Sequence, residues 1–425
     1  MVPLTTRQGM TATELLSRVG GREVVLWGTG DLAQDVLTSL TKAGITVAAF
    51  LDTRASAVEK PLHGRPVRSA AEVLAQAGEV FVVLATPTFR QQAEAQCLKA
   101  GLRKGEDVIS HLSVPRPQAI IDIANDCSLA CTGCIRQTQG RHPAPALMDA
   151  ATFAQVLDKL AAELPLLSHI DLALSGEPLL NPDLPRIIAL AEGVAPCTVA
   201  TGLAVDGPLE PLILAQPSRL DVTAFGFGES YDLAVPGGDW GTFTRRLAEM
   251  RMLIARHQPR TRFQVRLYTV RQDAPDLQER WRNLLQDSGI ALAPQVPYVM
   301  PYDRILTRCE GEVPSPATRR AEEALPWNLE RVLDACAQER HLPCLSQRIF
   351  PVINTDLSVG LCHLYNAPTV APDYLATSWE TLLALRHDAA CCQRCQAYGL
   401  HRLDLDVLVR RHSGLFDPPS PSGEI

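Results

Sequence analysis

Stretches typical of buried strands alternate with helical stretches along most of the chain, and this alternation constrains the fold more than any other feature. Six strand-like runs follow one another from residue 119 onward, with helical stretches between most of them. They are AIIDIAN, HIDLALS, CTVAT, LDVTAFG, FQVRLYTV and ALAPQVPYV. Successive βα units place parallel strands side by side with helices covering them. The sequence therefore predicts a partial (β/α)6 barrel of the TIM type over 119–312.

A smaller series of the same alternation precedes the predicted barrel. Within 22–112, REVVLW, TVAAFLD and EVFVVLA are typical of buried strands, and DLAQDVLTSLTKA and TFRQQAEAQCLKAG are typical of helices. A Rossmann-like parallel α/β domain is therefore predicted over 1–112, followed by the proline-containing linker SVPRPQ at 113–118. The pattern becomes irregular and cysteine-rich over 313–411, and the tail at 412–425 is expected to be disordered.

Composition and charge exclude several classes of function. The net charge is -7 at pH 7, so the basic surface of a nucleic-acid-binding protein is missing. No apolar run reaches the roughly 18 residues that a membrane span needs, and the first residues lack the apolar core of a signal peptide. The arginines between Arg245 and Arg260 have the spacing of the wet face of an amphipathic helix. We therefore expect a cytoplasmic protein without nucleic-acid or membrane partners.

Three cysteines occupy one short loop after the first strand of the predicted barrel. The stretch IDIANDCSLACTGCIR contains Cys127, Cys131 and Cys134. In a reducing cytosol, clustered cysteines more often bind metal or carry out redox chemistry than form disulfides. The carboxyl ends of barrel strands surround one opening, where three thiolates can hold three corners of an iron–sulfur cube. The fourth iron would lack a protein ligand and could bind a substrate or cofactor, as an open zinc site can.

The C-x3-C-x2-C spacing in this position resembles the signature of the radical S-adenosylmethionine (radical SAM) superfamily. The second predicted strand ends in LSGEPLL, where Gly176, Glu177 and Pro178 match the superfamily's glycine–glutamate–proline motif. The resemblance implies that the loop cysteines hold a [4Fe–4S] cluster whose open iron binds S-adenosylmethionine. Glu177, the candidate catalytic residue, would accept a hydrogen bond from the methionine amino group. Gly176 would allow close backbone approach, and Pro178 would hold Glu177 extended.

Two strand ends depart from the superfamily's pattern. Many relatives have Thr-Asn-Gly after the third strand, where this chain has Thr201, Gly202 and Leu203. The fourth strand of relatives usually ends in a Ser-Leu-Asp-Gly-like stretch that helps to hold the ribose, whereas AFGF stands here and Thr223 is the nearest hydroxyl. Thr201 and Thr223 are therefore the candidates for ribose contacts. The next segment, GESYDLAVPGGDWGTFTRRLAEM, is similar to that of relatives with a SPASM extension.

Cysteines near the carboxyl terminus resemble the SPASM/twitch extension of the same superfamily. Cys344 is followed by Gly360 and Cys362, and a later CxxC pair is formed by Cys392 and Cys395. The resemblance implies that these four cysteines ligate one auxiliary [4Fe–4S] cluster, because no cysteine follows Cys395 to serve a second one. A zinc ribbon stays open as the alternative, since four thiolates also suit tetrahedral zinc.

The remaining cysteines are not predicted ligands. Cys391 would compete with Cys392 for one position, and the CxxC spacing favours Cys392. Four others are expected to be small core residues, namely Cys97, Cys197, Cys309 and Cys336. A functional role stays open for Cys309 and Cys336, which lie nearer the auxiliary ligands in the sequence.

The amino-terminal domain carries a motif of its own. LWGTGDLA places Gly28, Gly30 and Ala33 between a predicted strand and a helix, and Asp52 ends the next strand. This context matches a dinucleotide fingerprint, with phosphate at the helix amino terminus and a ribose hydroxyl on Asp52. The domain also resembles nucleotide-binding-type modules attached to sugar-modifying acyltransferases and some methyltransferases. Binding of a nucleotide or nucleotide-linked sugar, a docking role, and a fold without ligand all stay open.

The resemblance implies a radical SAM oxidoreductase or maturase. An electron from a flavodoxin- or ferredoxin-type donor would cleave S-adenosylmethionine, and the 5′-deoxyadenosyl radical would abstract hydrogen from the substrate while the auxiliary cluster assists oxidation. The extension favours a peptide or protein substrate, whereas the amino-terminal domain favours a nucleotide-linked sugar. Candidates for the substrate pocket lie in VPYVMPYDR, namely Tyr298, Tyr302, Asp303 and Arg304. The alternatives are an NAD-dependent dehydrogenase with structural zinc and a non-catalytic metal-binding protein.

Overall fold

The computed structural model of the chain consists of two compact units. One comprises 7–117 and 164–168, and the other comprises 1–6, 118–163 and 169–425. The residues that the structure describes are 12–52, 61–86, 90–111, 114, 117–131, 134, 136, 145–164, 166–205, 207–270, 273–295, 303–323, 325, 327–341, 344, 350–363 and 369–403. The predicted tail at 412–425 lies outside them, and the domain boundaries expected from the sequence stay predictions.

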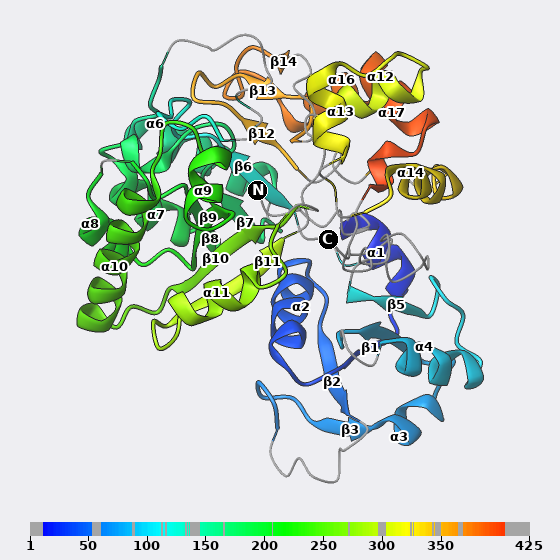
Figure 1. Cartoon of the computed structure of the whole chain (residues 1–425). Helices are drawn as coiled ribbons and strands as arrows, with labels where there is room; N and C mark the ends of the chain where they lie inside the picture. Colours follow the sequence, from blue (N-terminus) through cyan, green and yellow to red (C-terminus); the bar gives the residue numbers. More distant parts are fainter. Residues whose placement is uncertain are drawn as a thin grey trace. The chain divides into compact units, whose positions relative to one another are not determined.

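The smaller unit contains a parallel five-stranded sheet with the strand order β3-β2-β1-β4-β5 (Figure 1). Its strands are β1 (Glu23–Trp27), β2 (Val47–Asp52), β3 (Val67–Ser69), β4 (Val80–Leu84) and β5 (Val108–Ser110). Its helices are α1 (Ala12–Val19), α2 (Asp31–Lys42), α3 (Ala70–Leu74) and α4 (Arg90–Lys99). The three strands expected from apolar runs are present, and the short strands β3 and β5 were not predicted.

Both faces of this sheet are covered by helices, which explains the continuous apolar runs of its strands. Leu26 and Phe81 belong to one buried cluster together with Val36 of α2. Trp27 and Val82 belong to a second cluster with residues of α3 and α4. Side chains alternate between the two clusters along β1, as the period of a strand requires.

The larger unit contains a nine-stranded sheet in the order β11-β10-β9-β8-β7-β6-β12-β13-β14 (Figure 1). Six of its strands lie parallel in sequence order, namely β6 (Gln118–Ile121), β7 (His169–Asp171), β8 (Cys197–Thr201), β9 (Arg219–Phe225), β10 (Arg262–Tyr268) and β11 (Ile290–Gln295). Each overlaps one of the six runs expected from the sequence. The prediction of a mixed α/β protein with parallel sheets is confirmed.

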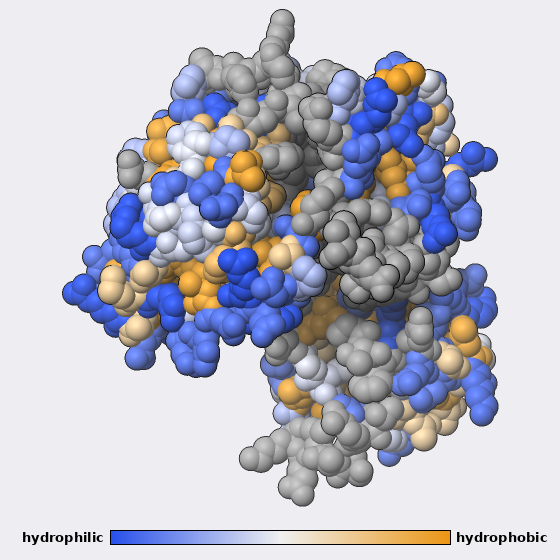
Figure 2. Space-filling view, viewed as in Figure 1, coloured by the Kyte–Doolittle hydropathy of each residue, from blue (hydrophilic) through white to orange (hydrophobic). Residues whose placement is uncertain are grey.

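Helices and 3-10 turns connect these strands. They are α6 (Ala150–Glu163), η3 (Pro178–Leu180), α7 (Leu184–Glu192), α8 (Leu209–Ala215), α9 (Glu229–Ala234), α10 (Trp240–His257) and α11 (Leu277–Leu284). The outer sides of α10 and α11 are mostly hydrophilic (Figure 2). No helix in the described part of the chain is long and apolar enough to cross a membrane.

The cysteine-rich region adds three strands to the edge of this sheet. They are β12 (Val352–Ile353), β13 (Val359–Gly360) and β14 (Thr369–Ala371). Its helical segments are α12 (Asp303–Cys309), α13 (Pro316–Glu323), α14 (Leu329–Gln338), α16 (Trp379–His387), α17 (Ala390–Ala397) and η4 (Leu400–Arg402). Since β12 pairs in parallel with β6, this region continues the sheet beside the strand that leads into the cysteine loop.

Candidate functional site

The cysteine loop follows β6 at the carboxyl end of that strand. Cys127, Cys131 and Cys134 are half-buried and carry reduced thiols. Arg136 fixes the shape of the loop, because its guanidinium donates to the carbonyl oxygen of Cys127 at 2.6 Å and pairs with the carboxylate of Asp126 at 2.9 Å. An ion pair between Asp126 and Arg136 therefore joins the two sides of the first predicted site.

The donor set of this loop fits an iron–sulfur cluster. Burial raises the pKa of Cys127 to about 11 and that of Cys131 to about 12, and the thiol of Cys134 adds to both shifts. Thiolates at such positions need positive charge close by, which iron supplies when it binds. Three adjacent thiols of this kind can occupy three corners of an iron–sulfur cube.

The loop after β7 is held against the end of β6 by a buried carboxylate. Asp122, which is 1% exposed, accepts hydrogen bonds from the backbone N–H groups of Leu174 at 3.1 Å and Ser175 at 3.2 Å. Burial raises the pKa of Asp122, and these hydrogen bonds oppose that rise. The two strand ends are thus joined just ahead of the predicted glycine–glutamate–proline motif.

The motif itself lies in direct backbone contact with the residues that lead into the cysteine loop. The N–H of Glu177 donates to the carbonyl oxygen of Asp126 at 2.8 Å. A Cβ at Gly176 would lie 1.8 Å from the carbonyl oxygen of Ala124, so glycine is needed for this close approach. Glu177 is extended, with φ -103° and ψ 111°, immediately before Pro178. The structure therefore brings the two predicted motifs together.

The carboxylate of Glu177 is buried and points into the backbone of its neighbours. Glu177 is 2% exposed and accepts hydrogen bonds from the N–H groups of Leu179 at 3.1 Å and Gly202 at 2.8 Å. Burial raises its pKa, and these hydrogen bonds oppose the rise. Its charge also raises the pKa of Cys127 and Cys131. The carboxylate is therefore close to the thiols and already fixed in position.

The two threonines proposed for ribose contacts differ in their surroundings. Thr201 is 2% exposed, and its hydroxyl accepts a hydrogen bond from the N–H of Leu203 at 2.9 Å. Leu203 has a positive φ of 62°, so this bond helps to hold a strained turn. Thr223 lies on β9, half-buried, in register with Arg266 of β10. A ribose contact by either residue stays a prediction.

Arg246 of α10 belongs to this neighbourhood, although the sequence pattern predicted a solvated face for the arginines of this helix. It is 7% exposed, and its guanidinium donates to the carbonyl oxygens of Gly207 at 2.6 Å and Leu203 at 3.4 Å. Its charge also opposes the raised pKa of Glu177. The prediction is wrong for Arg246 because buried loop carbonyls after β8 require a donor.

A signal for this burial was present in the sequence. Arg246 stands at the i+3 position of a helical stripe whose other members are buried apolar side chains, namely Phe243, Leu247 and Met250. A cation within such a stripe indicates a polar partner inside the protein.

The segment after β9 that the sequence analysis singled out packs against the cysteine loop. The N–H of Ala130 donates to the carbonyl oxygen of Pro236 at 2.7 Å. Gly237 has a φ of 88°, and a Cβ there would lie 2.5 Å from the carbonyl oxygen of Ser128. This glycine is therefore required by both its conformation and its neighbour.

Three of the four predicted auxiliary ligands interact electrostatically with one buried arginine. Arg386, in the last turn of α16, is 0% exposed and interacts electrostatically with Cys362, Cys392 and Cys344. The fourth, Cys395, belongs to a buried core against which Cys362 also packs. Cys362 and Cys395, which come from two separate segments, therefore belong to one packed region. In the part of the chain that it describes, no three His, Cys, Asp or Glu side chains are arranged to hold a single metal ion.

The remaining cysteines mostly lie in the hydrophobic core. Three are fully buried, namely Cys97, Cys197 and Cys336. Cys309 and Cys391 are half-buried and pack against the same core as Cys395. The expectation of core residues is met for the first three and only in part for Cys309.

The turn between β1 and α2 carries the glycines of the predicted dinucleotide fingerprint, and its backbone conformation requires glycine at the first of them. Gly28 has a φ of 135°, and a Cβ there would lie 2.6 Å from the carbonyl oxygen of Ala85. Gly30 is the N-cap residue of α2, and no atom lies within 4 Å of a Cβ built at this position. Asp52 is 8% exposed and accepts a hydrogen bond from the hydroxyl of Thr29 at 2.8 Å. Nucleotide binding by Gly28, Gly30 and Asp52 stays a prediction.

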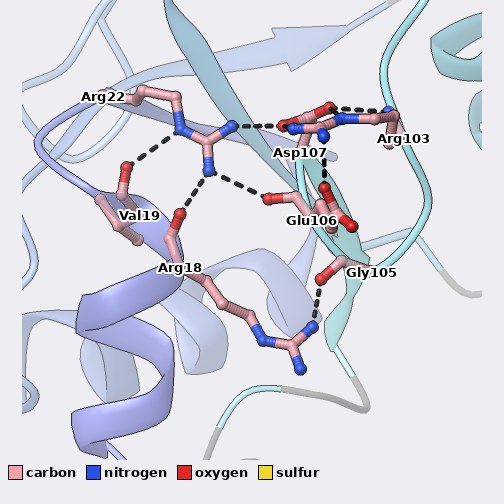
Figure 3. Close-up of polar contacts among 7 residues, drawn as sticks. All are labelled: Arg18, Val19, Arg22, Arg103, Gly105, Glu106 and Asp107. Atoms are coloured by element: carbon pink, nitrogen blue, oxygen red, sulfur yellow. Dashed lines mark hydrogen bonds and ion pairs between the residues drawn. The ribbon is translucent and has the colours of Figure 1, made fainter.

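A hollow of about 470 Å³ lies at the other end of this unit, beside the start of β1 and β5. It is lined by Arg18, Arg22, Arg103, Lys104, Gly105 and Glu106. Figure 3 shows that the arginines here point to partners within the protein. Arg22 and Arg103 bind the carboxylate of Asp107 at 2.6 and 2.8 Å, and Arg18 donates to the carbonyl oxygen of Gly105. This cluster joins the end of α1 and the start of β1 to the segment before β5, and its cations already have partners within the protein.

The substrate-pocket candidates are only partly described. Tyr298 and Tyr302 lie outside the described residues. Asp303 begins α12, and Arg304 in its first turn is half-buried. Their role stays a prediction.

Comparisons with known proteins give matches to solved structures only. No protein-family model and no curated protein sequence matches the chain. One similar structure is that of anSMEcpe with bound AdoMet, at 12% identity and a TM-score of 0.41, covering 67% of this chain and 88% of that chain. Another is SuiB of Streptococcus suis bound to the precursor peptide SuiA, at 10% identity and a TM-score of 0.44, covering 88% and 80%. A third is BtrN in complex with AdoMet and 2-DOIA, at 11% identity and a TM-score of 0.37, covering 68% and 92%.

Proposed function

We propose that the chain is a radical SAM enzyme with a SPASM/twitch-like extension. The observation that carries the proposal is the contact between two motifs at adjacent strand ends, where Gly176 and Glu177 lie against Ala124 and Asp126 beside the cysteine loop. Neither motif is specific alone, and their direct contact at the carboxyl ends of parallel strands is what an active site of this class requires.

Each part of this site has a distinct role in the proposal. Cys127, Cys131 and Cys134 would hold the [4Fe–4S] cluster, which would supply the electron for the cleavage of S-adenosylmethionine to methionine and a 5′-deoxyadenosyl radical. Glu177 and neighbouring carbonyl oxygens accept hydrogen bonds from the amino group of the bound cofactor. Abstraction of a hydrogen atom from a substrate C–H bond by this radical would give 5′-deoxyadenosine and a substrate radical.

The cysteine-rich region holds an auxiliary [4Fe–4S] cluster in this proposal. Cys344, Cys362, Cys392 and Cys395 are the ligands, and the packing of Cys362 and Cys395 in one buried core supports this set. The auxiliary cluster would accept an electron from the substrate radical or ligate the substrate. The six sequential parallel strands would form the partial barrel, and the smaller unit would be the Rossmann-like domain.

Iron content and product formation test the proposal together. We expect about eight irons per chain after anaerobic purification and about four after Cys127, Cys131 and Cys134 are all replaced by alanine. With S-adenosylmethionine and dithionite, the wild-type protein should form 5′-deoxyadenosine and the triple variant should not. Cys197→Ala is the matched control, because this buried thiol should leave both readouts unchanged.

Other outcomes would contradict the proposal in recognisable ways. Zinc in place of iron would favour the dehydrogenase with structural zinc. Iron without 5′-deoxyadenosine from the wild-type protein would favour a non-catalytic iron–sulfur protein. Either result would remove the radical chemistry.

The substrate is proposed to be a peptide or protein, or a nucleotide-linked sugar. The SPASM/twitch-like extension favours the former, and the fingerprint of Gly28, Gly30 and Asp52 favours the latter. A flavodoxin- or ferredoxin-type protein is the proposed electron donor, in the cytoplasm. A thermal-shift screen with NAD, NADP and nucleotide sugars tests the second class, because a ligand that binds the folded protein raises its melting temperature.

A further inference from the structure

We infer that Arg136 is a positioning residue for Glu177, which it reaches through the peptide group between Asp126 and Cys127. This inference rests on the proposed function, because it concerns the contact between the cysteine loop and the glycine–glutamate–proline motif. It gives Arg136, which belongs to neither motif, a role in placing both of them.

The guanidinium of Arg136 binds the chain on both sides of this peptide group. Its Nη2 atom donates to a carboxylate oxygen of Asp126 at 2.9 Å, and its Nη1 atom donates to the carbonyl oxygen of Cys127 at 2.6 Å. The side chain of Arg136 is 11% exposed, so solvent screens these contacts only weakly. The planar fork of an arginine suits two acceptors at once, which the single ammonium of a lysine does not.

The carboxylate of Asp126 holds the N–H end of the peptide group. The same oxygen that binds Arg136 accepts a hydrogen bond from the N–H of Cys127 at 2.9 Å. The Asp126 side chain is 42% exposed, so without the guanidinium it would be free to rotate toward solvent. Arg136 therefore keeps the acceptor of the Cys127 N–H in place.

Glu177 binds the opposite end of the same peptide group. Its N–H donates to the carbonyl oxygen of Asp126 at 2.8 Å. A peptide group is planar, so its C=O and its N–H turn together and point in opposite directions. A rotation that releases the N–H of Cys127 from the Asp126 carboxylate therefore also turns the carbonyl oxygen away from Glu177. The contact between the two motifs thus depends on the ion pair between Asp126 and Arg136.

The loop after β7 contains a second contact that serves as a reference. The N–H of Leu174, three residues before Glu177, donates to the carboxylate of Asp122 at 3.1 Å. This hydrogen bond uses neither Asp126 nor Arg136. A general loosening of the loop would expose the amides of Leu174 and Glu177 alike, whereas rotation of the peptide group would expose only that of Glu177.

The test is hydrogen exchange at single backbone amides of the anaerobically purified full chain. Arg136→Met should speed exchange at the amide of Glu177 about tenfold and leave that of Leu174 unchanged. Asp126→Ala should have the same effect, and the double variant should exceed neither single variant, because both changes break one path. Asp126→Asn keeps the acceptor oxygen and should retain most of the protection. Arg186→Met is the matched control, because it replaces an exposed arginine of α7 and should change neither amide.

The same variants should differ in the KM for S-adenosylmethionine. Arg136→Met should raise this KM about tenfold, because Glu177 is displaced, and Asp126→Asn should keep the wild-type value. Unchanged exchange at Glu177, equal acceleration at Leu174, additive effects in the double variant or an unchanged KM would each overturn the inference. A wild-type protein that forms no 5′-deoxyadenosine would overturn the proposed function instead, and the exchange at Glu177 would still show whether Arg136 holds the contact.

Discussion

The backbone N–H of Glu177 donates to the carbonyl oxygen of Asp126 at 2.8 Å, which joins the loop after β7 to the residue that precedes Cys127. Glu177 follows Asp126 by 51 positions in the sequence, yet one hydrogen bond and one glycine contact bring the two motifs together. A movement of either loop therefore displaces the other.

Gly176→Ala tests this coupling. The new Cβ would lie 1.8 Å from the carbonyl oxygen of Ala124 in the present backbone, so one of the two loops must move. We expect the free energy of unfolding to fall by about 1–3 kcal/mol and the formation of 5′-deoxyadenosine to fall at least about tenfold, a change of about 1.4 kcal/mol in the barrier. Urea denaturation and a product assay measure the two effects.

Gly78→Ala is the control for this substitution, because no atom lies within 4 Å of a Cβ at that position. It should leave both measurements unchanged. Wild-type activity in Gly176→Ala would show that the loops are not coupled as the structure indicates.

The second prediction concerns Arg246, which supports the loop after β8. Arg246→Met would leave the carbonyl oxygens of Gly207 and Leu203 buried without these donors. We expect a loss of about 2–3 kcal/mol in the free energy of unfolding, because each unsatisfied buried group is costly. Urea denaturation of the full chain measures it.

Arg256→Gln gives the matched control on the same helix. Its side chain is 72% exposed, so the free energy of unfolding should change by no more than about 0.5 kcal/mol. Equal losses in the two variants would contradict a specific role for Arg246.

The strands were predictable because parallel strands covered on both faces are continuous apolar runs. The short strands β3, β5, β12, β13 and β14 were missed, since two or three residues carry too little pattern. The contact between the cysteine loop and Gly176 could be expected from strand order alone. The burial of Arg246 could be inferred only from its place in an apolar stripe.

The arrangement of the carboxy-terminal ligands was less accessible to sequence reasoning. The spacing of Cys344, Cys362, Cys392 and Cys395 suggests a shared site, but it gives no information on the surrounding charge. Arg386 lies between two cysteine segments and resembles any arginine near a helix end. Its burial depends on the packing of α16 against β14 and α17, which is a tertiary effect.

The third prediction separates the two glycines of the fingerprint. Gly28→Ala combines a positive φ of 135° with a Cβ 2.6 Å from the carbonyl oxygen of Ala85, so we expect a melting temperature lower by several degrees. Gly30→Ala meets open space and should leave the melting temperature of the free protein nearly unchanged. If a nucleotide binds there, Gly30→Ala should also reduce the stabilisation that it gives. Equal destabilisation by both substitutions would contradict the backbone described for this turn.

The last prediction is a pH dependence of the smaller unit. Hydrogen bonds and ion pairs with Arg103 and Arg22 hold the pKa of Asp107 well below its usual range (Figure 3). A carboxyl group whose folded-state pKa is lowered contributes stability above its unfolded pKa of about 3.9, and this contribution is lost as the pH falls toward the folded value.

Asp107→Asn should therefore speed hydrogen exchange in β5 about tenfold at pH 7, and the difference from wild type should shrink below about pH 4. Glu106→Gln is the control, because its ion pair with Arg103 is exposed on both sides and should contribute little. A difference between Asp107→Asn and wild type that stays constant from pH 7 to pH 3 would contradict the ionised carboxylate as its source.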